Sequence, residues 1–299
     1  MKILREYVSE ALAKKVAIGH FNISNIEGFW AVVRAAKDLG ATVGYEIPVI
    51  IGVSEGERSF IGVEQVRALV DTVRTSGQPV FLNADHTYSY DKVTEVVSAG
   101  YDSVIYDGTE QGFDDNVATT KKCVEYAHSV VKSASRDIMV EGELGFIGKS
   151  SKVLEKIPDG VKISEEFLTK PEEAKKFVEA TGVDMLAPAV GNIHGMLSGG
   201  KDPALNIKRI KEIYDAVKIP LVLHGGSGNS AEDFISAIDA GVAIIHVNTE
   251  IRVAFRKALR KELEENSEEI APYKIMKSPL LAMQAVITEK LRIFNKLVG

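Results

Sequence analysis

Histidines stand at the ends of three apolar, β-branched runs that the sequence predicts as strands. His86 closes "PVFLNADH", His194 comes shortly after "DMLAPAVGN", and His224 ends "PLVLH" just before "GGSG". Three imidazoles that meet at one point can hold a tetrahedral metal ion and leave a position open for substrate, the usual arrangement of catalytic Zn²⁺. A single histidine is more often a hydrogen-bonded structural residue, so the hypothesis depends on the three runs ending at the same place.

Carboxylates accompany these histidines. Asp85 directly precedes His86, and "EGELG" places Glu141 and Glu143 two residues apart, on the same side of an expected strand. If that side faces a buried lumen, unpaired acids are costly there, and a nearby cation explains them best. For Glu141, a salt bridge to a lysine is the alternative.

The other three histidines carry weaker signals. His20 lies in an expected strand and His128 in an expected helix, and we expect both to be structural. His246 lies in the last expected strand, and the pattern leaves its role open.

Two short loop sequences suggest an anion site. In "HGGSG", Gly225 and Gly226 would let backbone N–H groups approach an anion, and the hydroxyl of Ser227 would add a donor. In "NTE", Thr249 is expected to be the N-cap of the following helix. Although "GGSG" alone is more often a plain turn, beside His224 it favours a phosphorylated substrate that reaches a metal.

The elements that must position these residues alternate along the whole chain. Eight short apolar runs are each followed by a helical pattern, which predicts a parallel sheet covered by helices and, with eight units, a (β/α)₈ TIM barrel. No linker interrupts the alternation, so we expect a single domain over residues 1–299, with an extra C-terminal helix within 279–299. The expected strands are 16–22, 48–54, 79–86, 102–108, 138–145, 184–192, 220–226 and 243–250.

Two connections are long and aperiodic, 148–170 and 191–203. Both follow expected strands, so both belong to the C-terminal face of the barrel, where barrel enzymes keep their active sites.

Composition excludes several classes of partner. The formal net charge is −6, and the basic residues are interleaved with Glu, which argues against nucleic acid or an anionic membrane as a partner. The one cysteine, Cys123, lies in a helical pattern and is expected to be a buried thiol. No run is apolar enough for a membrane span and the N-terminus is unlike a signal peptide, so we expect a cytoplasmic protein.

Five motifs occur in the order seen in class II, zinc-dependent fructose-bisphosphate and tagatose-bisphosphate aldolases, and the chain resembles that family over nearly its whole length. The motifs are "ADH" (84–86), "EGELG" (141–145), "GNIHG" (191–195), "HGGSG" (224–228) and "NTE" (248–250), extended by "FNISN" (21–25) and "VSEG" (53–56).

The resemblance implies roles for particular residues. His86, His194 and His224 would bind Zn²⁺, with Glu143 as an additional or alternative ligand, and Asp85 would handle the proton of the C4 hydroxyl. It further implies a substrate-phosphate site and backbone oxygens near Gly195 and Gly225 that often hold Na⁺ or K⁺. The phosphate contacts would be Gly195, Gly226, Ser227 and Thr249, and polar residues near the substrate would be Asn22, Ser54 and Asn248. Family members are dimers or larger, so a homo-oligomer, a dimer or a tetramer, is expected.

The sequence departs from the family pattern around the expected site. In the loop that usually supplies a proton-exchanging glutamate, Ser150 and Ser151 stand where acids are expected, and Glu155 is the proposed substitute. After "HG" a lysine is usual, whereas here Lys201 is the nearest cation. In the last strand motif, His246 and Asn248 replace the usual residues; other substituents at the second position help distinguish fructose from tagatose substrates in the family.

The chemistry agrees with these residue types. Retro-aldol cleavage leaves an enediolate, which an enzyme stabilises with a lysine Schiff base or with a Lewis-acid metal. The expected strand 184–191 carries no lysine, and neither do the ends of 79–86, 138–145 and 220–226, so the metal route is favoured.

We therefore expect a metal-dependent lyase that reversibly cleaves fructose 1,6-bisphosphate to dihydroxyacetone phosphate and glyceraldehyde 3-phosphate, a step of glycolysis and gluconeogenesis. An aldolase for tagatose 1,6-bisphosphate or another phosphorylated ketose, or a metal-assisted isomerase, is the second hypothesis. A non-catalytic barrel that acts through a protein partner is the third.

Overall fold

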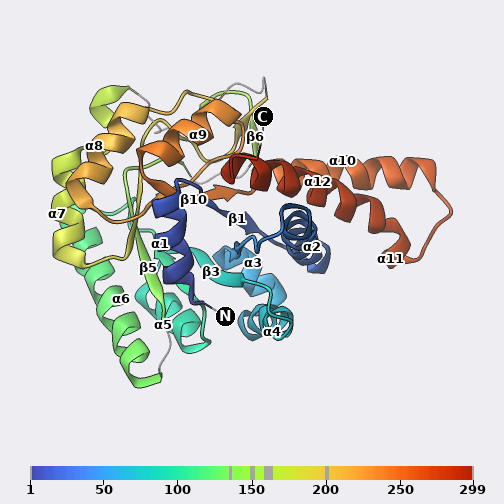
Figure 1. The fold of residues 1–299 in the computed structure, drawn as a ribbon, viewed down its shortest axis with the longest axis horizontal. Helices are drawn as coiled ribbons and strands as arrows, with labels where there is room; N and C mark the ends of the chain where they lie inside the picture. The colour runs from blue at the N-terminus through green and yellow to red at the C-terminus, as the bar shows by residue number, and fades with distance from the viewer. Residues whose placement is uncertain (1, 135–136, 149–151, 158–163, 199–201, 298–299) are drawn as a thin grey trace.

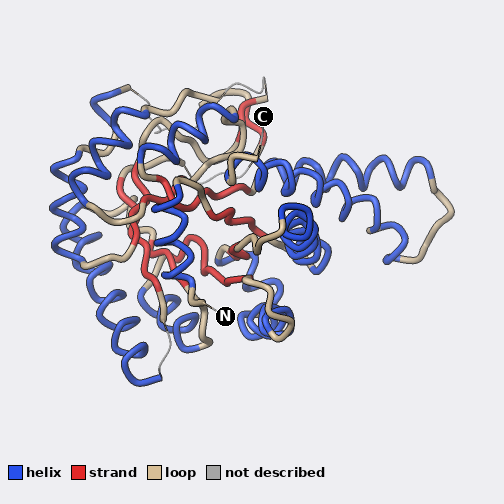
Figure 2. Tube along the Cα trace, in the orientation of Figure 1, coloured by secondary structure: helices blue, strands red, loops and turns tan. Residues whose placement is uncertain are grey.

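The computed structural model describes residues 2–134, 137–148, 152–157, 164–198 and 202–297. Eight parallel strands form a closed barrel in the order β1-β10-β9-β7-β5-β4-β3-β2, which confirms the expected TIM barrel. Figure 2 shows the strands gathered at the centre of the molecule with helices around them. The barrel strands are β1 (Ile18–Asn22), β2 (Val49–Val53), β3 (Val80–Thr87), β4 (Ser103–Tyr106), β5 (Met139–Leu144), β7 (Met185–Pro188), β9 (Leu221–Leu223) and β10 (Val242–Val247).

The helices between the strands bury one apolar face against the barrel, and their ends follow the local sequence. The side chain of Asn25 accepts a hydrogen bond from the Gly28 amide at the start of α2, and Ser230 and Asp233 form a capping box on α9. These helices are α2 (Ile26–Val43), α3 (Glu55–Ile61), α4 (Val63–Arg74), α5 (Tyr90–Ser98), α6 (Phe113–Ala134), α7 (Pro171–Thr181), α8 (Ile207–Val217) and α9 (Ala231–Ala240).

An N-terminal helix, α1 (Leu4–Lys14), closes one end of the barrel. Its buried residues Leu4, Tyr7 and Val8 join a core layer made by the first halves of the strands, which includes Ile50 and Phe81. Because the N-terminal ends of the strands are covered in this way, the cavity for a ligand is left at their C-terminal ends.

The C-terminal part of the chain forms a long arm. Figure 1 shows α10 (Thr249–Glu265) and α12 (Lys277–Phe294) side by side, extending away from the barrel, with α11 (Pro272–Ile275) at the tip. The inner part of α12 buries Ile287, Leu291 and Phe294 in the main core. The expected C-terminal helix is thus present, and its outer half leaves the body of the protein.

Two very short strands were not expected. β6 (Val153–Leu154) and β8 (Met196–Leu197) pair in parallel, so that the loops that follow β5 and β7 are joined above the barrel. A single 3₁₀ turn, Glu165–Phe167, follows in the first of these loops before α7.

Candidate active site

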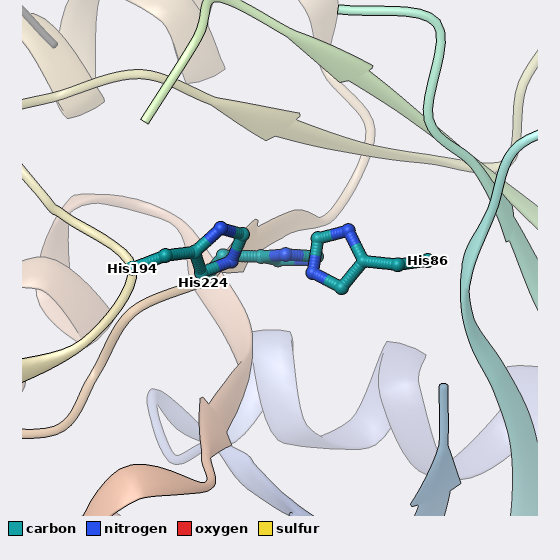
Figure 3. Close-up of side chains that lie close together, drawn as sticks. All are labelled: His86, His194 and His224. Carbon is teal, nitrogen blue, oxygen red and sulfur yellow. The ribbon is translucent and has the colours of Figure 1, made fainter. Parts of the chain in front are cut away.

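Three histidine rings converge at the C-terminal end of the barrel. His86 lies near the end of β3, His224 directly follows β9, and His194 lies in the loop after β7. The ring centroid of His86 is 4.6 Å from that of His194 and 5.0 Å from that of His224. Figure 3 shows the three side chains pointing toward one another. One ligand nitrogen from each ring lies within 4.8 Å of the others. The expected grouping of these three histidines is therefore present.

Each of the three rings has one nitrogen bonded to a neighbouring acceptor. Nδ1 of His86 lies 3.1 Å from Oδ2 of Asp107, and Nδ1 of His194 donates to the carbonyl oxygen of Gly148. Nε2 of His224 lies 2.7 Å from Oε1 of Glu141, and its buried Nδ1 has no hydrogen-bond partner in the part of the chain that the structure describes. Metal-ligating histidines characteristically use their second nitrogen in this way, because the bond fixes the ring and leaves the other nitrogen free to coordinate. The donor set fits a metal ion.

Buried acids close to the rings also fit a cation. Oε2 of Glu143 lies 3.6 Å from Nδ1 of His86 and makes no hydrogen bond to the described residues. Burial raises the pKa of both Glu141 and Glu143 well above the usual range, neighbouring carboxylates such as Asp85 add to this effect, and His86 opposes it only in part. For Glu141, the partner is the imidazole of His224 and the alternative of a salt bridge to lysine is wrong.

The three imidazoles do not share one protonation preference. Burial lowers the pKa of His194 and of His224 to about 3, so both rings are neutral and can offer a lone pair. Burial acts in the same direction on His86, but the carboxylates of Asp85, Asp107 and Glu143 outweigh it and raise the pKa of His86 to about 10. An acid-rich pocket around His86 is the electrostatic setting that a dication stabilises.

Asp85 and His86 face the same cavity although they are consecutive residues. Successive side chains of a regular strand point to opposite faces, but the pairing of β3 with β4 is irregular between Ala84 and Thr87. At this point His86 takes a positive φ of 38°, which is rare for a residue with a side chain and costs backbone strain. The irregularity gives the site an acid and an imidazole side by side.

The Asp85 carboxylate is held in place from several sides. Its Oδ2 accepts a hydrogen bond of 2.8 Å from Nδ2 of Asn22, and its Oδ1 faces Nδ1 of His246 at 3.4 Å. Burial works against ionisation, yet His86 and His246 hold the pKa of the Asp85 carboxyl well below its usual range. Asp85 is therefore an ionised, oriented acceptor of protons.

A cavity of about 600 Å³ opens above these residues, a size suited to a small organic ligand. It brings together most of the residues that the sequence singled out. Among them are Asn22, Ser54, Asp85, His86, His194, Gly195, His224, Gly225, Ser227, His246, Asn248 and Thr249, and the wall is completed by Glu55, Gly56, Tyr88, Lys152 and Arg252.

The "GGSG" loop differs in detail from the expectation. The amide of Gly226 donates to the carbonyl of His246 at 3.1 Å, and Gly226 is not among the residues that line the cavity. A Cβ on Gly225 would lie 2.1 Å from the carbonyl oxygen of Ile193, so this glycine is required by close backbone packing. Ser227 does line the cavity, and its hydroxyl accepts from the Glu250 amide at 3.3 Å.

The helix start at the cavity is one residue earlier than expected. Asn248 is the N-cap of α10 and Thr249 is its first residue, so the expectation of Thr249 as the N-cap is wrong. β10 ends at Val247, and Asn248, whose φ of −130° and ψ of −58° are not helical, stands between the strand and the helix as the N-cap. Both side chains still reach the cavity, at the positive end of a 17-residue helix.

The loop after β5 is only partly described. Ser150, Ser151 and Lys201 lie outside the described residues. Glu155 is exposed and is not among the residues that line the cavity, whereas Lys152, on the same loop, does line it. The structure thus does not bring Glu155 to the other site residues.

Some site residues were missed from the sequence. Asp107 follows β4 and holds His86, and its position directly after "SVIY" at a strand end was the available signal. Arg252 lies one turn into α10 and lines the cavity, but on an amphipathic helix it looked like any solvated cation. Its Nη2 pairs with Oε1 of the buried Glu57 at 2.5 Å, and Glu57 also accepts from Asn22.

The histidines other than His86, His194 and His224 have different surroundings. His128, on α6, pairs with Oδ2 of Asp184 at 3.0 Å, as expected of a structural residue. His20 is fully buried and stacks on His246 beneath the cavity, so it lies closer to the site than the sequence suggested.

Cys123 is buried, as expected. Among the described helices, none combines the length and the apolar character that crossing a membrane requires.

The fold and the site have clear counterparts among known proteins. The family model "Fructose-bisphosphate aldolase class-II" matches residues 2–297. Fructose-bisphosphate aldolases of Geobacillus stearothermophilus and Staphylococcus aureus are 36% and 35% identical over 297 residues, which is 98% of this chain and 96% of each relative. Among solved structures, the YdjI aldolase of Escherichia coli K12 superposes with a TM-score of 0.76 at 29% identity, covering 98% of this chain and 96% of that one. The chain belongs to the class II fructose-bisphosphate aldolase family, and it is accordingly a lyase.

Proposed function

We propose that this chain reversibly cleaves fructose 1,6-bisphosphate into dihydroxyacetone phosphate and glyceraldehyde 3-phosphate. The observation that carries the proposal is the meeting of three imidazoles, each with its second nitrogen held, beside the buried carboxylate of Asp85 in one cavity. The names of the relatives from Geobacillus stearothermophilus and Staphylococcus aureus point to the same reaction.

We infer that His86, His194 and His224 hold Zn²⁺, with Glu143 as an additional or alternative ligand. Three histidine nitrogens with a fourth position left for substrate are the preferred set of catalytic zinc, and the cation would replace the proton that Asp85, Asp107 and Glu143 favour on His86. When bound, the cation supplies positive charge where negative charge develops as the carbon–carbon bond breaks.

Asp85 is the group we assign to proton transfer at the C4 hydroxyl of the sugar. Its carboxylate is ionised, is oriented by Asn22, and lines the cavity beside His86. A group that is fixed within reach of the reacting proton typically contributes 10²- to 10⁴-fold to the rate, in round numbers about 3 to 5 kcal/mol.

One of the two phosphates, which we take to be that on C1, would lie at the start of α10. Gly195, Ser227 and Thr249 line this part of the cavity, and a helix N-terminus favours an anion through its free amides and its dipole. Gly226 directly precedes Ser227 in the chain, and we propose that it lies next to this anion. We also propose that carbonyl oxygens near Gly195 and Gly225 hold Na⁺ or K⁺.

A bisphosphate also needs a counter-charge at its far end. Arg252 and Lys152 are the cations among the described residues that line the cavity. The guanidinium of Arg252 is half-exposed and is oriented by Glu57, next to Asn22 and Ser54. We therefore assign Arg252, with Ser54 and Asn22, to the second phosphate.

A second candidate is an aldolase for tagatose 1,6-bisphosphate or another phosphorylated ketose. Asn248 favours it, because this side chain lines the cavity at the position where the resemblance expects a residue that helps select between the two sugars. The reaction type and the metal would be the same.

We also propose a homo-oligomer, a dimer or a tetramer, with the C-terminal arm as its contact. The arm extends away from the barrel and exposes large apolar side chains that a monomer would leave in water. They are Leu263, Ile270, Tyr273 and Leu281.

The test is a coupled assay of glyceraldehyde 3-phosphate release from fructose 1,6-bisphosphate, with and without a chelator, repeated with tagatose 1,6-bisphosphate and with ketose 1-phosphates. Chelator-sensitive cleavage that zinc restores is the expected result. Protein that holds one zinc per chain and cleaves none of these substrates would refute the proposal.

A further inference from the structure

Three imidazole rings stack beneath the cavity, from His20 through His246 to His224. The ring centroids of His20 and His246 are 3.5 Å apart with planes 3° from parallel, and those of His246 and His224 are 4.1 Å apart at 21°. We call this stack the histidine column. It comes from β1, β10 and the end of β9, which are neighbours in the barrel, and it ends on a proposed metal ligand.

The barrel makes room for the buried end of the column. His20 and His246 are direct partners in the register of β1 and β10, so both rings enter the lumen at the same height. A Cβ on Gly52 of β2 would lie 2.1 Å from Cε1 of His20, so a glycine is needed for the ring to fit. Nε2 of His20 is fixed by the Asn83 side chain at 3.0 Å. The ring of His20 is therefore held by its face and by its edge.

The middle ring of the column faces Asp85. Nδ1 of His246 lies 3.4 Å from Oδ1 of Asp85, while Asn22 binds the other carboxylate oxygen at 2.8 Å. Oδ1 is buried and makes no hydrogen bond with full geometry to the described residues. Nε2 of His86 lies farther from this oxygen, at 3.9 Å, so Nδ1 of His246 is the nearer of the two imidazole nitrogens. The plane and height of the His246 ring set that distance, and stacking fixes both.

A second metal ion held by His20, Asp85 and His246 is a weaker reading of the same cluster. Their potential ligand atoms lie within 4.8 Å of one another. Nitrogen lone pairs, however, lie in the ring plane, and two parallel rings 3.5 Å apart cannot both aim them at one ion. The stacked geometry suits rings that support each other and not rings that share a ligand.

We propose that His246 is a positioning residue for Asp85, and that His20 acts through His246 by holding the ring face opposite His224. This rests on the proposed role of Asp85 in proton transfer. In this assignment His20, which does not line the cavity, affects turnover more than substrate binding. A displacement of the order of 1 Å at such a group can cost up to about 100-fold in rate.

The first test separates the ring face from the ring nitrogens. His246→Phe keeps a flat ring and removes Nδ1, and we expect kcat to fall about 10- to 100-fold with KM and bound zinc within about twofold. His20→Ala should lower kcat about tenfold, and His20→Phe, which restores a stacking face, should recover most of that loss. Should His20→Ala not fold, His20→Asn takes its place. His128→Ala removes a histidine away from the cavity and is the matched control.

Two results would overturn the proposal. One is His246→Phe with wild-type kcat. The other is a loss of activity that follows a loss of zinc in the His246 or His20 variants, because the column would then serve the metal site alone. Equal kcat for His20→Ala and His20→Phe would remove His20 from the assignment.

The second test does not use activity. In protein labelled with ¹⁵N at histidine and freed of metal, Asp85→Asn should shift the imidazole signal that disappears in His246→Phe and leave that of His128 in place. An unshifted His246 signal contradicts the contact. If the wild type cleaves no ketose phosphate, the proposed function fails, whereas the contact between His246 and Asp85 is still decided by this spectrum.

Discussion

Oε1 of Glu141 and Nε2 of His224 form a hydrogen bond of 2.7 Å between two side chains that are each 1% exposed. The bond leaves Nδ1 of His224 with no hydrogen-bond partner among the described residues, and the ring belongs to the group of three histidines that could hold a metal ion. Because a buried carboxylate of this kind orients the ring and raises its basicity, Glu141→Gln should weaken zinc binding about 10- to 100-fold. Zinc affinity measured by competition with a chromogenic chelator checks this, with Glu179→Gln on the exposed face of α7 as a control. Unchanged affinity would make Glu141 a packing residue only.

Asp85→Asn should retain the hydrogen bond from Asn22 and lose the proton acceptor. We expect cleavage to fall by about 10² to 10⁴ while the substrate still binds with near wild-type affinity. Calorimetric titration of the variant with fructose 1,6-bisphosphate and single-turnover kinetics separate the two effects. A variant that binds no substrate would assign Asp85 to binding instead of proton transfer.

Arg252→Gln should affect substrates with two phosphates only. A hydrogen bond between charged groups contributes about 1.5 to 3 kcal/mol, which is about 10- to 100-fold in KM for fructose 1,6-bisphosphate. Fructose 1-phosphate lacks the second phosphate, so its KM should change by less than about threefold, because the contact that Arg252 makes is absent in that complex. Equal losses for the two substrates would mean that Arg252 serves mainly to neutralise Glu57.

Glu155 remains our prediction for the proton-exchanging group of the loop after β5, and it must move to act because it is exposed and outside the cavity wall. Glu155→Ala should then lower kcat by more than about tenfold. The exchange with solvent of a proton on the hydroxymethyl carbon of dihydroxyacetone phosphate, followed by NMR, reports this step directly. A smaller loss would assign the role to another residue within 148–170.

The pair of His128 and Asp184 predicts a pH-dependent contribution to stability. The hydrogen bond to Asp184 raises the pKa of His128, so the stabilisation is complete below the ordinary value of about 6.5 and is lost as pH rises through the raised value. Since His128 is about a third exposed, we expect no more than about 1 kcal/mol. Urea unfolding of the wild type and His128→Gln at pH 5.5 and pH 9 should show the larger gap at pH 5.5. A gap that grows with pH would contradict the assignment.

The barrel and the grouping of His86, His194 and His224 could be predicted because their signals are local. Eight apolar runs with helical patterns between them specify the fold, and strands of one barrel end at one mouth, which brings His86 and His224 together. His86 was expected to close its strand, and β3 continues one residue further, to Thr87, beyond the irregular pairing that follows Ala84.

Contacts between distant segments could not be predicted in the same way. β6 and β8 are two residues long and exist only because two loops meet, so neither loop carries a strand pattern of its own. The stack of His20 on His246 depends on the register between the first and last strands, and that register becomes fixed only when the barrel closes. The hydrogen bond from the Gly226 amide to the His246 carbonyl likewise joins segments that meet only when the barrel closes.

The start of the loop after β5 is tied to His194, a proposed metal ligand, by two hydrogen bonds. The amide of His194 donates to the carbonyl of Ile147, and its ring donates to the carbonyl of Gly148. A movement of Ile147 or Gly148 would pull His194 away from His86 and His224, so the proposed movement of Glu155 must leave these two residues in place. Ile147 and Gly148 thus form one rigid unit with the proposed metal site, and they take no part in any movement that would bring Glu155 to the substrate.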